Sequence, residues 1–287
     1  MKLYPIETGN FKLDGGAMFG IIPKSLWQKS NPADSNNKIE LAMRALLIEE
    51  DKRLILIDCG IGSKQTEKFF SYYDLYGTNN LESSLAKNGF SKEDITDVFL
   101  THLHFDHCGG AVDLLGENFV PAFKNARYWS NAEHWKWATQ PNAREKASFL
   151  PENFLPIENS GQLNFIDLPT SGNFLKDSPL GFDLFFVDGH TDKQMLPVLN
   201  YKGKKLMYVA DLVPTSGHVP LVYVMGYDTR PLLTLDEKQA FLEKAANEGY
   251  LLFFEHDANY ELATVKNTEK GVRLDETYSF TEVFGNS

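Results

Sequence analysis

Several features that would point to a function class are scarce in this sequence. Only two cysteines, Cys59 and Cys108, occur in 287 residues, which excludes a disulfide scaffold and favours a reducing compartment. No apolar run approaches the roughly 20 residues that cross a bilayer, since the strand-like runs Leu54–Ile57 and Leu251–Phe254 stop after four. We therefore expect no membrane partner.

Positive charge is also scarce. The chain has 28 basic against 39 acidic residues and a formal net charge of −11, which would repel a phosphate backbone, so we expect no nucleic-acid partner. The only cluster of lysines near a turn, Lys202–Lys205, predicts a hairpin turn with a solvated face. The first residues lack the apolar stretch of a secretory signal, so we expect a cytoplasmic location.

The composition, with 43% hydrophobic and 13% aromatic residues, is that of an ordinary globular protein. Short β-branched and aromatic runs alternate with helical patterns, which predicts a single α/β domain over residues 1–287. The expected strands are Glu40–Glu49, Leu54–Asp58, Asp97–Thr101, Phe182–Val187, Leu206–Ala210 and Leu251–Glu255. The expected helices are Leu81–Asn88, ended by Gly89, and Glu237–Glu248, capped by Asp236 and ended by Gly249. Ser91 with Asp94 predicts a capping box. The proline-rich stretch Gln140–Asn173 predicts a long loop with local structure rather than a domain boundary.

The strongest chemical signal follows the strand-like run Val98–Leu100. Three of the seven histidines and one aspartate, His102, His104, Asp106 and His107, fall within six residues. In extended chain, His102 and His104 point the same way, and a turn can bring Asp106 and His107 to a second position. One loop can thus supply two metals about 3.5–4 Å apart, and imidazole with carboxylate suits zinc and similar divalent ions.

This segment resembles the HxHxDH signature of the metallo-β-lactamase superfamily. That superfamily needs three further ligands at strand ends, and each has a match here. His190 lies in a turn similar to the superfamily's GHT turn, Asp211 follows the run Leu206–Ala210, and His256 follows the run Leu251–Glu255. The resemblance covers most of the chain.

The resemblance implies an αββα four-layer sandwich with a dinuclear centre, most simply of two zinc ions. One metal would be held by His102, His104 and His190, the other by Asp106, His107 and His256, with Asp211 bridging both. Two divalent cations outweigh the charges of Asp106, Asp211 and a bridging hydroxide, so the centre stays positive. It can then lower the pKa of its water and stabilise an oxyanion, which gives both aspartates a catalytic role.

Two further features of the sequence indicate which branch of the superfamily the chain resembles. The commonest β-lactamases have a cysteine where this chain has Asp211, whereas lactonase, thioesterase and phosphotriesterase-like branches have the aspartate. Leu13–Trp27 resembles the opening of acyl-homoserine-lactonase-like and methyl-parathion-hydrolase-like members. Within it, Met18 and Phe19 are candidates for an apolar wall of the substrate pocket or for a homodimer contact, with ordinary core packing as the alternative.

Three other positions leave alternatives open. Well-known lactonases of this branch have a tyrosine three residues after the bridging aspartate, but this chain has Pro214 there. His218 or Tyr223 could polarise the substrate carbonyl instead, or either could be structural. Asp58 would orient the metal-binding loop or simply end a strand.

Two kinds of side chain are left out of the metal set. Cys59 and Cys108 are read as buried small hydrophobes. His134 lies among three tryptophans on an expected short helix, where packing is the commoner role.

The expected function is a dinuclear hydrolase that opens the ring of N-acyl-homoserine lactones by attack of metal-bound hydroxide, which is quorum quenching. Phosphotriesters, aryl esters and thioesters remain alternatives, because each passes through an oxyanion that two cations stabilise. The expected partner is thus a small-molecule lactone or ester. A rival from another class is a non-catalytic metal-binding sensor on the same fold.

Overall fold

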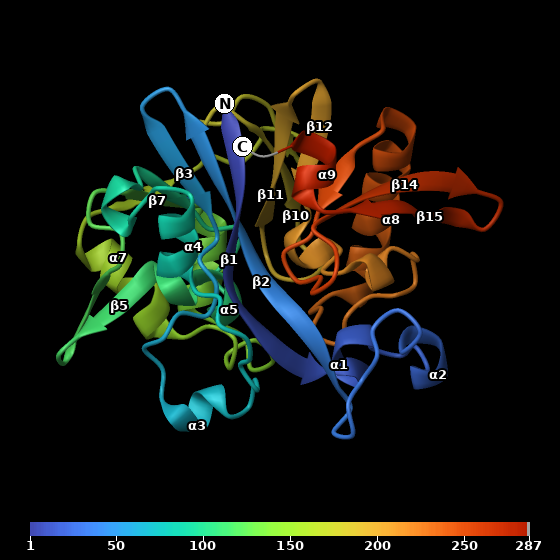
Figure 1. The fold of residues 1–287 in the computed structure, drawn as a ribbon, viewed down its shortest axis with the longest axis horizontal. Coiled ribbons are helices and arrows are strands. Elements are labelled where there is room, and N and C mark those ends of the chain that lie inside the picture. The colour runs from blue at the N-terminus through green and yellow to red at the C-terminus, as the bar shows by residue number, and fades with distance from the viewer. Residues whose placement is uncertain (286–287) are drawn as a thin grey trace. The chain divides into compact units, whose positions relative to one another are not determined.

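The computed structural model describes residues 1–285 and shows a mixed α/β protein (Figure 1). Its contacts divide it into two compact units, the first made of residues 1–10 and 43–172 and the second of residues 11–42 and 173–285. Two of the three boundaries fall inside the long strands β1 (Lys2–Asp14) and β2 (Lys38–Glu50), which contribute to both units. The prediction of a single domain stays a prediction.

The first unit is built on a six-stranded sheet in the order β1-β2-β3-β4-β7-β8. Its other strands are β3 (Arg53–Ile57), β4 (Asp97–Phe99), β7 (Arg127–Ser130) and β8 (Leu163–Phe165), with a separate hairpin of β5 (Val112–Leu115) and β6 (Asn118–Pro121). Its helices are α3 (Glu67–Phe70), α4 (Leu81–Lys87), α5 (Phe105–Cys108), α6 (Ala132–Thr139) and α7 (Leu155–Asn159), with 3₁₀ turns Lys92–Asp94, Gly109–Ala111 and Pro151–Asn153. Since β3, β4, β7 and β8 are parallel, their carboxyl ends share one edge of the sheet.

The second unit is built on a seven-stranded sheet in the order β15-β14-β13-β12-β11-β10-β9. Its strands are β9 (Phe174–Leu175), β10 (Asp183–Val187), β11 (Gln194–Tyr201), β12 (Lys204–Tyr208), β13 (Leu251–Phe253), β14 (Leu262–Thr268) and β15 (Gly271–Tyr278). Its helices are α1 (Gly15–Phe19), α2 (Lys24–Trp27), α8 (Pro231–Glu248) and α9 (Phe280–Phe284), with 3₁₀ turns Ala210–Leu212 and Ser216–His218. Helix α8 packs against β14 (Figure 1).

Every strand expected from the sequence is present, with ends that differ by a few residues. The strand expected over Leu206–Ala210 ends at Tyr208, because Ala210 has a φ of 37° and opens a 3₁₀ turn. The hairpin turn at Lys202 is confirmed: Lys202 and Gly203 have φ values of 48° and 77°, typical of a two-residue turn between antiparallel strands. Strands β1, β5 to β9, β11, β14 and β15 were not predicted.

The helix predictions were less exact at the start of α8. Asp236 was expected to cap a helix over Glu237–Glu248, but α8 begins at Pro231, so Asp236 lies inside the helix. Proline is favoured in the first turn, where its missing N–H costs nothing. Gly249 does end α8 in a left-handed conformation, and the capping box of Ser91 and Asp94 is present.

The region Gln140–Asn173, expected as a long loop with local structure, contains α7, β8 and one 3₁₀ turn. Within the described residues, no helix combines the length and apolar character that crossing a bilayer requires.

Candidate metal centre

In the first unit, one buried carboxylate organises the histidine-rich loop that follows β4. Asp58 directly follows β3 and is fully buried. It accepts hydrogen bonds from the backbone N–H of Thr101 at 2.8 Å and from the Thr101 hydroxyl at 2.6 Å. The same carboxylate lies 3.1 Å from Nδ1 of His107. The expected contact of Asp58 with the metal-binding loop is therefore present, and it fixes both ends of the loop.

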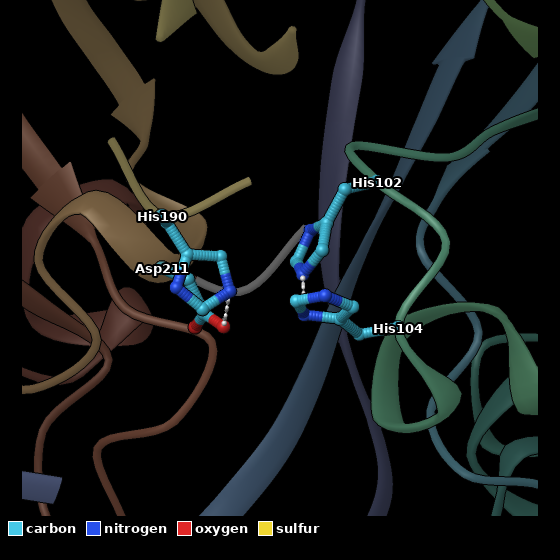
Figure 2. Close-up of side chains that lie close together, drawn as sticks. All are labelled: His102, His104, His190 and Asp211. Atoms are coloured by element: carbon cyan, nitrogen blue, oxygen red, sulfur yellow. Dashed lines mark hydrogen bonds and ion pairs between the residues drawn. The ribbon is translucent and has the colours of Figure 1, made fainter. Parts of the chain in front are cut away.

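The hydroxyl of Thr101 also fixes the state of His102. Since its proton is donated to Asp58, its oxygen accepts from Nδ1–H of His102, 3.1 Å away. That selects the tautomer whose Nε2 carries the lone pair. This Nε2 lies 3.1 Å from Nδ1 of His104 (Figure 2), close to the roughly 3.3 Å that separates two nitrogens bound at about 2.0–2.1 Å to one tetrahedral ion.

His104 has the opposite tautomer, because its Nε2 faces the buried carboxylate of Glu145 at 3.5 Å. Its Nδ1 is then the nitrogen directed toward His102. The loop also carries Asp106 and His107, and Oδ2 of Asp106 lies 3.9 Å from Nε2 of His107. All four side chains are buried.

In the second unit, His190 lies between two carboxylates. Its Nδ1 is 2.9 Å from Oδ1 of Asp228, and its Nε2 is 3.0 Å from Oδ2 of Asp211 (Figure 2). Burial lowers the pKa of His190, but the two carboxylates outweigh that effect and raise the pKa to about 10. The site thus attracts a positive charge at Nε2, which a metal ion can supply in place of a proton.

Asp211 faces two histidines with its two oxygens. Its Oδ2 is directed to His190, while its Oδ1 lies 3.1 Å from Nε2 of His256. The Nδ1–H of His256 donates to the carbonyl of Ala42 at 2.9 Å, which again leaves the lone pair on Nε2. A carboxylate with one oxygen toward each of two histidines has the arrangement of a bridging ligand.

These residues fit divalent metals in chemistry as well as position. Imidazole nitrogens and carboxylate oxygens are the donors that zinc prefers, and the opposite nitrogen of each imidazole contacts a neighbouring acceptor that orients it. Histidines and carboxylates of the chain fall into clusters able to hold a metal ion. The sequence match agrees, since residues 44–256 match the metallo-beta-lactamase superfamily.

The chain belongs to the metallo-beta-lactamase superfamily. A probable metal-dependent hydrolase from Staphylococcus aureus is 28% identical, with a TM-score of 0.83, covering 97% of this chain and 96% of that one. AidC, a dizinc quorum-quenching lactonase in complex with the product N-hexanoyl-L-homoserine, is 25% identical, with a TM-score of 0.77, covering 96% and 94%. The predicted superfamily and its mixed α/β fold class are thus confirmed.

A curated relative, the N-acyl homoserine lactonase AiiB of Agrobacterium fabrum (strain C58), is 26% identical over 147 residues. That match takes in 46% of this chain and 52% of AiiB, so it spans about half the length of that relative. The neighbours of this superfamily member therefore include lactonases and a metal-dependent hydrolase.

Two of the residues expected to contact substrate lie in the core of the second unit. Phe19 is fully buried and stacks on His218, with ring centroids 4.2 Å apart, and on Trp27, with centroids 5.2 Å apart. Met18 is 1% exposed. The surroundings of Met18 and Phe19 match the core-packing alternative, and their role in substrate binding stays a prediction.

His218 has both ring nitrogens engaged inside the protein. Its Nε2–H donates to the carbonyl of Met18 at 2.9 Å, and Nδ1 accepts from the Thr215 hydroxyl at 2.8 Å. Burial lowers the pKa of His218 to about 3, although the contact with Met18 opposes the shift. This geometry is structural, so Tyr223, which is partly exposed, becomes the stronger candidate to polarise a carbonyl.

The side chains left out of the metal set have other roles. Nε2 of His134 accepts the backbone N–H of Leu103 at 2.9 Å, which supports the loop between His102 and His104. Cys59 and Cys108 are buried and unbonded to each other, and burial raises the pKa of the Cys108 thiol to about 12.

Sequence reasoning missed three carboxylates that support the candidate ligands. Asp228 contacts His190, Glu145 faces His104, and Glu237 accepts the N–H groups of Asp188 and Gly189 at 2.7 and 2.9 Å. None belongs to a recognised motif, and Asp228 lies 38 positions from its partner. Only the fold brings these groups to the ligands.

Proposed function

We propose that this protein is a dinuclear metal-dependent hydrolase that opens the lactone ring of N-acyl-homoserine lactones. In this assignment His102, His104 and His190 hold one ion, and Asp106, His107 and His256 hold the other, with Asp211 bridging. Zinc is the preferred metal because the donors are imidazoles and carboxylates. When bound, two such ions polarise a carbonyl and lower the pKa of water.

The observation that carries the proposal is the orientation of Asp211. Its two oxygens lie 3.0 and 3.1 Å from Nε2 atoms of two different histidines, His190 and His256. A structural site for one tetrahedral ion would have no use for a carboxylate divided in this way, since four ligands complete it. The buried Asp211 and Asp106 also provide negative charge that offsets part of the charge of two cations.

The chain's own residues then have separate tasks. Asp58 and Asp228 hold His107 and His190 in the metal-binding tautomer. The hydroxyl of Tyr223 donates a hydrogen bond to the carbonyl oxygen of the substrate. It thereby takes the role of the tyrosine that well-known lactonases have at the position of Pro214. A neutral lactone is not repelled by a protein of net charge −11. Its acyl chain gains binding free energy when it is buried against an apolar wall of the pocket.

Support for the substrate class comes from AidC, which resembles this chain over 96% of its length and is a lactonase. Quorum quenching follows as the biological role we propose. A cytoplasmic location and homodimer formation stay predictions from the sequence.

The proposal is tested by incubating the metal-loaded protein with a panel of substrates and measuring each hydrolysis rate by pH-stat titration. We expect the protein to hydrolyse medium- and long-chain acyl-homoserine lactones with a higher kcat/KM than glutathione thioesters and penicillins. Four extra methylenes should raise kcat/KM by about two orders of magnitude if the acyl chain is buried, at roughly 0.8 kcal/mol each. No lactone turnover by protein that retains its metals would contradict the proposal, and no turnover of any substrate in the panel would favour the non-catalytic sensor.

A second candidate is a phosphotriesterase or aryl esterase on the same centre. Pro214 favours it, because the chain lacks the tyrosine that assists lactone carbonyls in well-known lactonases of this branch. Thioesters are a further alternative substrate. Turnover of a phosphotriester or aryl ester far above every lactone would support this candidate and leave the hydrolase centre unchanged.

A further inference from the structure

Helix α8 carries a lysine where its pattern calls for an apolar residue. Its inward face is formed by Thr234, Lys238, Phe241 and Ala245, at the three- and four-residue spacing of a buried stripe. Lys238 is 0% exposed. Fully buried lysines are rare because an ammonium loses its hydration, so such a residue needs compensating contacts.

The compensating contacts all come from one irregular segment, the loop 220–223. The Nζ of Lys238 donates to the carbonyls of Pro220 at 3.1 Å, Leu221 at 3.3 Å and Tyr223 at 2.9 Å. An ammonium has three N–H donors, so each donor of Lys238 can form a hydrogen bond with this loop. Burial lowers the pKa of Lys238 to about 7, and the charge of Asp228 opposes the shift.

A pocket of about 430 Å³ adjoins the loop and is lined by the loop itself, by Gln239 and Leu242 of α8, and by the turn 270–273. Backbone carbonyls outside regular structure need donors, and Lys238 supplies them where the sheet does not. The lysine is therefore the main anchor of the loop on the α8 side.

The loop carries Tyr223 into contact with the α1 turn. The Tyr223 ring meets Phe19 edge-on, with centroids 6.1 Å apart and planes at 89°. Phe19 in turn is fixed by its stacking on His218. A shift of the loop would therefore move Tyr223 relative to a fixed aromatic wall.

We propose that Lys238 is a positioning residue that fixes the loop 220–223 through its three carbonyls and thereby sets where Tyr223 meets the substrate. The proposal rests on the proposed function for the role of Tyr223. The holding of the loop does not depend on that role, so the two can be tested apart.

The first measurement is hydrogen exchange of residues 219–226 in the metal-loaded protein. Lys238→Met keeps the volume but removes every donor, so we expect exchange in this segment to rise at least tenfold, because the loss of a single charge-assisted hydrogen bond already accounts for that factor. The matched control is Lys244→Met on the same helix, where the exposed lysine pairs with Glu248. It should leave exchange unchanged, and both variants should keep the wild-type metal content.

If Lys238→Met does not fold, Lys238→Gln retains two N–H donors and should give a smaller rise in exchange. Exchange at the wild-type rate in a folded Lys238 variant would overturn the proposal.

The second measurement is a double-mutant cycle with Tyr223→Phe, using the best substrate of the panel. Lys238→Met should lower kcat about tenfold with little change in KM, and by less than about twofold when Tyr223 is already phenylalanine, because coupled residues are not additive. Equal effects in both backgrounds would overturn the link to Tyr223. Faster loop exchange with no lactone turnover in the wild type would instead contradict the proposed function and leave the anchoring by Lys238 standing.

Discussion

The two units supply their candidate metal ligands in different ways. In the first unit four ligands fall within six residues of one loop, His102 to His107, and Asp58 holds that loop at both ends. In the second unit His190, Asp211 and His256 follow three separate strands, and His190 and His256 each have their own supporting acceptor. The first arrangement is encoded locally, and a single carboxylate, that of Asp58, holds both ends of the loop. The second arrangement is encoded by the order of strands in the sheet, and its supports are distributed along the chain.

The largest expected effect comes from Asp211→Asn in the distributed set. An amide bridges two cations poorly, so we expect loss of one metal and a fall in kcat/KM of about a thousandfold, with the fold retained. Elemental analysis measures the metal content, and the hydrolysis panel measures kcat/KM. Asp275→Asn, at an exposed position of β15, is the matched control. Retention of full metal content by Asp211→Asn would show that the bridging role is wrong.

The next effect compares the supporting carboxylates of the two units. Asp58→Asn and Asp228→Asn should each weaken metal affinity about 10–100-fold, as is usual when an orienting acceptor is lost. We expect Asp58→Asn to be worse, because Asp58 accepts three hydrogen bonds from the loop. Competition with a chelator measures the affinities, and a larger loss for Asp228→Asn would reverse the comparison.

The same contrast explains which parts of the molecule the sequence could predict. The strand ends that carry His102, His190 and His256 follow apolar runs that are visible by inspection, and their order matched a known superfamily. Strand β1 was missed because its sequence mixes polar and apolar residues without strict alternation. Supports such as Asp228 and Glu145 were missed because their partners are distant in sequence and no local pattern marks them.

Side-chain roles were predicted least well around α1. Phe19 and His218 were singled out as functional, but the sequence does not say that the two rings stack on each other in the core. Lys238 shows the reverse problem, since a charged residue on a helix is expected to face solvent unless its neighbours are known.

A smaller effect is expected from His134→Ala in the first unit. The substitution leaves the buried N–H of Leu103 without its acceptor, which costs about 1–3 kcal/mol of stability. Metal content should stay unchanged, because His134 is no ligand in this assignment. Urea unfolding with elemental analysis separates the two effects, and a metal loss as large as that of Asp211→Asn would show that the ligands were assigned wrongly.

The smallest effect is a difference in pH dependence in the second unit. Burial lowers the pKa of His218 from its ordinary value of 6.5 to about 3, so the unfolded chain binds a proton more readily than the folded one. The stability due to neutral His218 is complete above pH 6.5 and is lost as the pH falls toward 3. Between pH 7 and 5.5 the wild type should lose about 1 kcal/mol more than His218→Gln. Parallel urea midpoints across this range would contradict the assignment of a buried, neutral His218.

The most direct test of the central claim is the number of metals per chain. Seven candidate ligands are too many for one tetrahedral ion, and Asp211 faces two histidines with separate oxygens. We predict that elemental analysis after gentle purification gives close to two metals per chain. A firm value of one that added zinc does not change would contradict a dinuclear centre.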